Sequence, residues 1–229
     1  MLLRNVQAQI HENLLRSSSF CSEGRQSPKS ALPLTPVGAL GHHKGMRNYL
    51  CALLCLGTPA FADGCHDLWF TRNLVMDRAG FCFGSTLGQA VFDNQDCIGK
   101  TVSLAPEWSQ FVSTVQSLEQ QFQCRVNTNQ TELLLDDAWV RRQLVHLPIA
   151  DELESACIGY NGAPRPVLSG QGLGYPVTGY ISAGDNISYG HLPNGNWIYV
   201  TYSGPDWVVK GGGWMGSDVT FPECNQWAG

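Results

Sequence analysis

Few residues after position 62 have the types and spacing that nucleophilic catalysis needs. His66, His146 and His191 are the only histidines there, and no two of them share a motif. The G-x-S-x-G sequence that presents a nucleophilic serine on a sharp turn does not occur. The adjacent acidic residues at 136–137 and 151–152 could act as acid and base, but neighbouring carboxylates on a helix usually form a solvated face. Catalysis by residues distant in the sequence, as in a hydrolase, is therefore the minor hypothesis.

Two further segments resemble ligand sites only in part. Residues 170–174 read Gly-Gln-Gly-Leu-Gly, but the Lys and Ser or Thr of a phosphate-binding loop do not follow them. Residues 93–96 offer oxygen ligands for calcium, but the glycine and glutamate that an EF-hand loop requires are replaced by Ile98 and Leu104. The cysteines and histidines are not clustered as zinc ligands are. The sequence predicts no metal site and no cofactor.

The cysteine count predicts disulfides in an oxidising compartment. Six cysteines follow position 62, an even number without a C-x-x-C pair. They are Cys65, Cys82, Cys97, Cys124, Cys157 and Cys224. A straight helix over residues 67–79 would separate Cys65 from Cys82 by roughly 20 Å, whereas a disulfide needs Cα atoms within about 7 Å. Pairing Cys65 with Cys97 and Cys82 with Cys124 is favoured, because the chain after the helix can fold back. Pairing Cys82 with Cys97 and Cys65 with Cys124 also respects the helix.

The first 62 residues are predicted to lie outside the folded protein. Residues 1–45 are rich in serine, proline and basic residues, and three interpretations fit them: a transit peptide, a disordered extension or, as favoured here, a misassigned start upstream of Met46. Residues 46–62 combine a positive charge, an apolar run at 49–57 and an Ala-x-Ala end. This order is typical of a secretory signal peptide cleaved after Ala62, and it predicts a periplasmic or secreted protein.

The chain after Ala62 is acidic. It holds eight basic and 17 acidic residues, so its formal net charge is −9. Nucleic acids and anionic membrane surfaces attract basic patches, and neither is predicted as a partner. No later segment approaches the about 20 apolar residues that a membrane span requires.

An amphipathic helix is predicted over residues 67–79, because apolar side chains recur there at helical spacing and Gly80 can end the helix. The pattern L-x-x-A-R-N-x-I-Y-A-R-H-G-x-x-F is met without a gap at Leu68, Arg72, Asn73, Val75, Arg78, Gly80 and Phe83. Departures occur at Thr71, Met76, Asp77 and Ala79. The segment resembles the bacterial YARHG domain, a short module of extracytoplasmic proteins, and residues 65–97 resemble a cysteine-rich family of uncharacterised secreted bacterial proteins. The resemblance implies no known reaction. Structural roles, with the arginine heads bonded to carbonyls or carboxylates near the helix ends, are predicted for Arg72, Asn73, Arg78 and Gly80.

Further helices complete a YARHG-like, cysteine-rich helical domain predicted over residues 63–157. A short helix is expected over residues 85–92, opened by a serine or threonine cap. The clearest helix begins at Pro106, which suits the first helical position. Its core-facing stripe consists of Trp108, Phe111, Val112, Val115, Leu118 and Phe122. A third long helix is expected over residues 136–147.

The composition changes to Gly, Pro, Tyr and Trp after residue 157, and short strands are expected between Gly-rich turns. The expected strands are 176–182, 186–192, 197–202, 207–210 and 214–219. Residues 192–200, 207–210 and 213–216 resemble a bacterial SH3-like domain, although the usual first-strand motif N-R-x-G-P is replaced at 185–190. The resemblance implies a small β-barrel over residues 158–229. Because the two ends of such a barrel lie close together, Cys157 is expected to pair with Cys224.

The predicted fold is therefore α+β, with a small disulfide-stapled helical domain followed by a small SH3-like β-barrel. Four aromatic residues of the second part, Tyr199, Tyr202, Trp207 and Trp214, are the candidate binding surface, because amphipathic rings suit binding sites. The barrel core is the equally weighted alternative for them. The predicted function is that of a non-enzymatic exported protein of the periplasm or cell envelope. It would bind a peptide, a glycan or a protein, with a cell-wall or envelope component as the partner.

Overall fold

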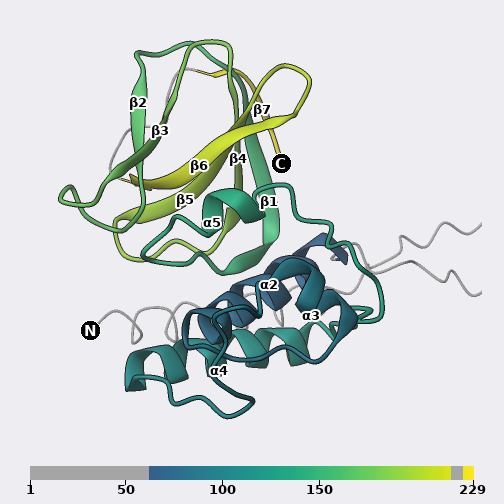
Figure 1. Cartoon of the computed structure of the whole chain (residues 1–229). Helices are drawn as coiled ribbons and strands as arrows, with labels where there is room; N and C mark the ends of the chain where they lie inside the picture. Colours follow the sequence, from purple (N-terminus) through teal and green to yellow (C-terminus); the bar gives the residue numbers. More distant parts are fainter. Residues whose placement is uncertain (1–61, 218–223) are drawn as a thin grey trace, which may run out of the picture.

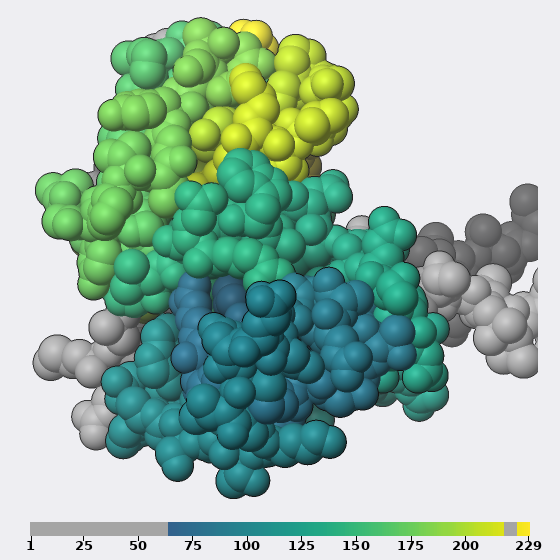
Figure 2. All heavy atoms as spheres, viewed as in Figure 1, coloured from purple at the N-terminus to yellow at the C-terminus, as the bar shows by residue number. Residues whose placement is uncertain are grey.

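The computed structural model describes residues 62–217 and 224–229. Two layers form this part of the chain: helices gather below one antiparallel sheet, and the segment around α5 lies between them (Figure 1). The space-filling view shows this middle segment packed against both layers (Figure 2). Among the helices of residues 62–217, none has the length and apolar character that a membrane span requires. Apart from Ala62, the predicted signal peptide lies outside the described residues.

Three helices form the lower layer: α2 (Ala62–Arg78), α3 (Thr86–Val91) and α4 (Pro106–Gln121). Helix α2 is followed by Gly80, whose φ of +83° suits glycine at a helix stop. The hydroxyl of Ser85 accepts a hydrogen bond from the backbone N–H of Gly88 and caps α3. Pro106 is the first residue of α4, as its fixed φ favours. The predicted helices at these three places are therefore confirmed by the local structure.

The predicted helix over residues 136–147 is wrong, because only the single turn α5 (Ala138–Arg141) forms there. At the end of this turn the backbone carbonyl groups accept hydrogen bonds from the side chain of Arg78 instead of from the next turn of a helix. The guanidinium Nη2 of Arg78 donates to the carbonyl oxygens of Arg141, Arg142 and Leu144 at 3.4, 3.2 and 2.8 Å. Arg78 thus joins the end of α2 to the chain after α5.

Replacing Arg78 with alanine is expected to lower the free energy of unfolding by about 1–3 kcal/mol, because partly buried carbonyl groups lose their donor. Urea unfolding of the oxidised protein measures this change. The exposed Arg125, replaced by alanine in the same way, is the matched control. A change within about 0.5 kcal/mol for the Arg78 variant, the range of ordinary surface substitutions, would show that water replaces the arginine at no cost.

Three disulfides join Cys65 to Cys124, Cys82 to Cys97 and Cys157 to Cys224. The favoured pairing of the first four cysteines is wrong, and the alternative pairing is present. The reason is that α4 runs antiparallel to α2 and carries Cys124 back to the first turn of α2. The antiparallel arrangement also places Glu119 of α4 at 2.9 Å from the Nε of Arg72. The second bridge closes the loop that holds α3.

The upper layer is an open antiparallel sheet of seven strands in the order β3-β2-β6-β5-β4-β1-β7. The strands are β1 (Ala150–Tyr160), β2 (Arg165–Leu168), β3 (Val177–Ile181), β4 (Asn186–His191), β5 (Trp197–Ser203), β6 (Val209–Gly216) and β7 (Cys224–Ala228). The open sheet takes the place of the small barrel that the SH3-like resemblance implied. Two strands explain the difference. The 11-residue β1 lies beside β4 and reaches into the segment expected to be helical, and β7 pairs with its outer edge.

A shared apolar core joins the two layers. It combines α2 residues such as Phe70 and Leu74 with Leu144 of the middle segment and with Tyr199 and Trp214 of the sheet. Burial of large apolar side chains at about 1.5–3 kcal/mol each favours one folded unit over two independent ones. The predicted boundary between residues 157 and 158 falls inside β1.

Candidate functional site

A buried cluster of charged side chains lies where the helices meet the sheet. At its centre is Arg141 of α5, which is 1% exposed. Its Nη1 and Nη2 atoms each donate to one carboxylate oxygen of Asp67 in α2 at 2.5 Å. Its Nε donates to Oδ2 of Asp137 at 2.9 Å. The hydroxyl of Tyr199 in β5 donates to the same Asp137 oxygen at 2.9 Å. One guanidinium thus holds α2, α5 and the sheet together.

Local structure explains how two of these groups meet. Asp137 and Arg141 stand four residues apart, the spacing that brings side chains together on one helical turn. The second carboxylate oxygen of Asp137 is buried without a hydrogen-bond partner among the described residues. Two buried carboxylates therefore share the guanidinium of Arg141.

The pKa values of the cluster follow from burial and from charge. Burial alone would raise the pKa of Asp67, but the charges of Arg141 and His191 outweigh it and hold the pKa far below its usual range. Burial opposes the charge of Arg141, yet Asp137 and Asp67 raise its pKa well above the ordinary value. For Tyr199, burial and the neighbouring Asp137 both raise the pKa. Asp67 and Arg141 are consequently ionised, and the tyrosine is neutral, at physiological pH.

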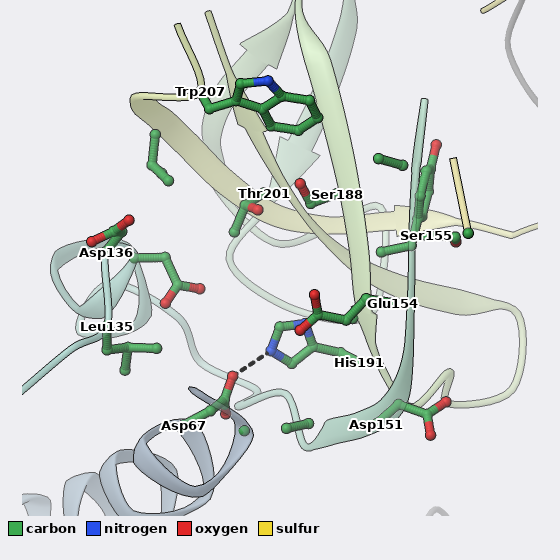
Figure 3. Close-up of a pocket in the computed structure, with 18 of the residues that line it drawn as sticks. Asp67, Leu135, Asp136, Asp151, Glu154, Ser155, Ser188, His191, Thr201 and Trp207 are labelled. Atoms are coloured by element: carbon green, nitrogen blue, oxygen red, sulfur yellow. Dashed lines mark hydrogen bonds and ion pairs between the residues drawn. The ribbon is translucent and has the colours of Figure 1, made fainter. Parts of the chain in front are cut away.

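His191, the last residue of β4, completes the cluster (Figure 3). Its Nε2 lies 2.9 Å from Oδ2 of Asp67 and 2.9 Å from Nη2 of Arg141. A single ring nitrogen either donates to the carboxylate or accepts from the guanidinium. In both cases Nε2 is engaged inside the cluster, which leaves Nδ1 as the other polar atom of the ring.

A pocket of about 680 Å³ opens in front of the cluster. Its walls carry three further carboxylates from Asp136, Asp151 and Glu154, and its far side carries the indole of Trp207 (Figure 3). Among the described residues, none of these three carboxylates forms an ion pair. Arg141 is the only lysine or arginine on the wall, and its charge is already matched by two buried carboxylates. The free charges that face the pocket are negative.

Trp207 has an unusual backbone for a large side chain. Its φ is +63°, a left-handed conformation that costs non-glycine residues about 1–3 kcal/mol. The surrounding turn enforces it: the N–H of Trp207 donates to the carbonyl of Gly204 at 3.0 Å, and the N–H of Val208 donates to Asp206 Oδ1 at 3.2 Å. The indole is nevertheless 48% exposed at the pocket. Residues with strained backbone conformations cluster at binding and active sites, so the conformation of Trp207 indicates a binding role for its exposed ring.

The four aromatic residues predicted as a binding surface do not lie together on the outside. Tyr199, Tyr202 and Trp214 are buried, so the core alternative describes them and an exposed four-residue surface does not form. Tyr199 and Trp214 are paired across β5 and β6 and pack into the core shared with the helices, whereas Tyr202 packs into the core on the other face of the sheet. Only Trp207 lines the pocket. Asp137, predicted to lie on a solvated helix face, is buried as well.

The other predicted site residues lie in the helical layer. Arg72 is paired with Glu119 across α2 and α4. The side-chain amide of Asn73 donates to the carbonyl of Trp69 at 2.8 Å, within α2. Gly80 ends the helix, and Arg78 reaches the chain after α5. Their structural roles remain predictions, and the bonds described here give the reason for each.

The side chains of the turn at residues 93–96 have a structural role. Asn94 accepts from the backbone N–H of Phe83 at 3.0 Å and donates to its carbonyl at 2.9 Å, so its side chain holds the loop around α3. Within residues 62–217 and 224–229, no three His, Cys, Asp or Glu side chains are grouped as metal ligands.

Comparison with known families divides the chain into two parts. Residues 57–120 match the YARHG domain, which confirms the resemblance of the first helix and its surroundings. Residues 123–229 match a domain of unknown function, DUF4453, rather than an SH3-like family. No protein of curated function and no solved structure matches the chain. The charge cluster spans both matched parts, because Asp67 belongs to the first and Arg141 and His191 belong to the second.

Proposed function

We propose that this chain is an exported, non-enzymatic binding protein of the bacterial periplasm or cell envelope. Its ligand is a peptide or protein segment that places a lysine or arginine side chain in the acidic pocket. The disulfide bonds and the YARHG domain support the extracytoplasmic location. One observation carries the choice of ligand: three carboxylates without an ion pair and an exposed, backbone-strained tryptophan line the same pocket of about 680 Å³.

The chemistry of the walls fits a cation on a long apolar stem. Hydrogen bonds between a cation and carboxylates contribute about 1.5–3 kcal/mol each. A cation over an indole face contributes about 0.5–1 kcal/mol at exposed sites and about 2 kcal/mol when desolvated. The apolar side chains of Leu134 and Leu135 line the same pocket and offer contact for the methylene stem. A neutral glycan lacks the positive charge that the carboxylates and the indole of this pocket favour.

Binding of N-acetylarginine amide and N-acetyllysine amide, measured by calorimetry, tests the proposal. Replacing Trp207 with alanine is expected to weaken binding about fivefold, the loss of roughly 1 kcal/mol of cation–π contact. Trp139, replaced by alanine, is the matched control, because it is 49% exposed against 48% for Trp207 and does not line the pocket. Raising the salt from about 0.1 M to about 1 M, which shortens the Debye length from roughly 10 to 3 Å, should weaken binding further.

The neutral N-acetylglutamine amide is the probe that decides the role of charge. Equal affinity for this probe and for the arginine amide would overturn the proposal, as would binding that ignores both salt and the Trp207 substitution. A pull-down from envelope extract with the disulfide-bonded protein then identifies the natural partner. We expect the retained proteins to elute with excess free arginine.

Hydrolysis of an envelope substrate is the second candidate function. The observation in its favour is the contact between Asp67 and His191 at a pocket whose wall also carries Ser155 and Ser188. Among the described residues, however, no hydrogen bond joins His191 to either serine, and its Nε2 is engaged by the cluster. Product release from peptide or peptidoglycan by the wild-type protein, lost in His191→Gln, would replace the binding proposal with this one.

A further inference from the structure

A second cavity of about 310 Å³ lies between α4, the middle segment and the sheet, next to the ends of β1 and β4. Ala150 and His191 are paired across β1 and β4 and line the acidic pocket. Ile149 and Leu192, one residue further along, line the second cavity and share a backbone hydrogen bond of 2.9 Å. The two cavities therefore border the same strand ends but share no lining residue.

The walls of this second cavity are mainly apolar and aromatic. Helix α4 contributes Trp108 and Phe111, whose rings meet edge to face with centroids 5.7 Å apart. The sheet contributes Trp214, and Leu147 and Val145 of the middle segment complete the apolar lining. Such edge-to-face geometry is the preferred arrangement between aromatic rings. A further ring that enters the cavity would find aromatic partners on two sides.

His146 supplies a fixed hydrogen-bond donor on the wall. Its Nδ1 accepts from the backbone N–H of Gln171 at 2.9 Å, so the neutral ring carries its proton on Nε2. The ring of Tyr175 lies edge to face with it at 5.0 Å, and the carbonyl of His146 accepts from Trp214 Nε1 at 2.7 Å. Burial lowers the pKa of His146, which keeps the ring neutral near pH 7. No described residue accepts from its Nε2–H.

Two amide side chains add a donor and an acceptor beside the histidine. The Nδ2 of Asn194 donates to Oε1 of Gln171 at 2.8 Å. This bond leaves the Nε2 of Gln171 as a donor and the Oδ1 of Asn194 as an acceptor, the complement of the C=O and N–H of one peptide group. Glu107 is the only charged side chain on the cavity wall, so a ligand with a negative charge is disfavoured.

We propose that this cavity binds an aromatic side chain of a peptide segment in a partner protein, with the adjoining peptide group held by Gln171 and Asn194. The volume lies at the lower end of the roughly 300–1,000 Å³ range of ligand pockets, which fits one side chain better than a larger ligand. The paired amide groups favour a peptide over a free aromatic compound. The site is distinct from the acidic pocket and does not depend on a cationic ligand there.

The probe is N-acetylphenylalanine amide, followed by heteronuclear NMR titration of the disulfide-bonded protein. We expect the largest shifts at the His146 ring, the side-chain amides of Gln171 and Asn194, and the Trp108 indole. Val145→Trp fills the cavity from a position that is already 45% exposed, and it should weaken binding at least about tenfold by steric exclusion. Val177→Trp, at a 48% exposed position that lines neither cavity, is the matched control and should leave binding unchanged.

Gln171→Leu is the second variant, and it removes the side-chain donor while keeping the backbone N–H that fixes His146. It should weaken binding about fivefold through the lost hydrogen bond. Phenol and N-acetylleucine amide complete the set of probes. Phenol binding as tightly as the phenylalanine amide would overturn the peptide assignment, and equal binding of the leucine amide would overturn the aromatic one. Trp207→Ala leaves this affinity unchanged, so failure of the cationic pocket and failure of this site are distinguishable.

Discussion

Replacing Arg141 with methionine is expected to lower the free energy of unfolding by about 3–5 kcal/mol, the cost of removing one partner from a buried ion cluster. The side chain is 1% exposed and serves both Asp67 and Asp137. Methionine fills a similar length but removes the guanidinium that both carboxylates share. Among the described side chains, Asp67 then keeps only His191 as a charged neighbour, and Asp137 keeps only the hydroxyl of Tyr199. Without the charge of Arg141, burial raises the pKa of Asp67 relative to the wild type, and the folded variant takes up a proton that the wild type does not.

Urea unfolding at neutral and at mildly acidic pH measures this loss. The deficit of the variant should shrink as the pH falls from neutral towards about 4, because the raised pKa of Asp67 lets the folded variant take up a proton before the unfolded chain does. Arg125→Met, at an exposed position, is the control for loss of an arginine as such. Adding Asp67→Asn to Arg141→Met should recover part of the loss, and a double variant less stable than the single one would contradict the assignment of Asp67 as its partner.

Removing the Cys157–Cys224 bridge by alanine substitution is expected to cost about 4 kcal/mol, between the values of roughly 3 and 4.7 kcal/mol for loops of 15 and 100 residues. Its cysteines are 67 residues apart in sequence, against 15 for Cys82 and Cys97. Removing the shorter bridge should cost about 3 kcal/mol. The difference between the two variants is more informative than either value, because each variant replaces two cysteines and only the length of the closed loop differs. We expect the larger loss of unfolding free energy for the Cys157–Cys224 variant.

Hydrogen exchange gives the second readout for the longer bridge. Strand β7 is the edge strand next to β1, so its amide groups should exchange faster once the bridge is gone. Protection in β5 and β6, at the middle of the sheet, should change only with global stability. Equal unfolding losses for the two bridge variants, with β7 still protected, would show that pairing with β1 alone holds this strand.

The parts of the fold that depend on nearby residues are those that the sequence predicts. Helix α4 has its proline at the first position and its apolar stripe at helical spacing, and both features are local. Ser85 before α3 and Gly80 after α2 likewise act within a few residues of their own position. Such signals require no knowledge of the tertiary fold.

Strand β1 shows why other parts escape prediction. Its residues 151–155 are mostly polar and carry no alternation of apolar side chains, so they read as a solvated helix. What makes them a strand is pairing with β4, which begins 26 residues after β1 ends, and with β7 beyond it. An irregular register between Ala150 and Ser155 further hides the periodicity.

The candidate site depends on distance in the same way. The partners of Arg141 include Asp67 and His191, which are 74 and 50 residues away along the chain. Asp137 does lie at helical spacing from Arg141, but it was expected on a solvated helix face. Trp207 was expected to begin a strand and to belong to an aromatic binding surface, but its left-handed backbone and its place on the wall of the acidic pocket follow from the folded structure.

The charge cluster also bears on how the two matched parts could be exchanged between proteins. A YARHG segment that carries Asp67 into a different C-terminal context would bring a carboxylate whose counter-ion stayed behind in the original protein. A C-terminal domain that supplies an arginine near Asp67 would fold stably with this segment. A domain without such an arginine would leave Asp67 as an unpaired buried charge and would destabilise the folded protein.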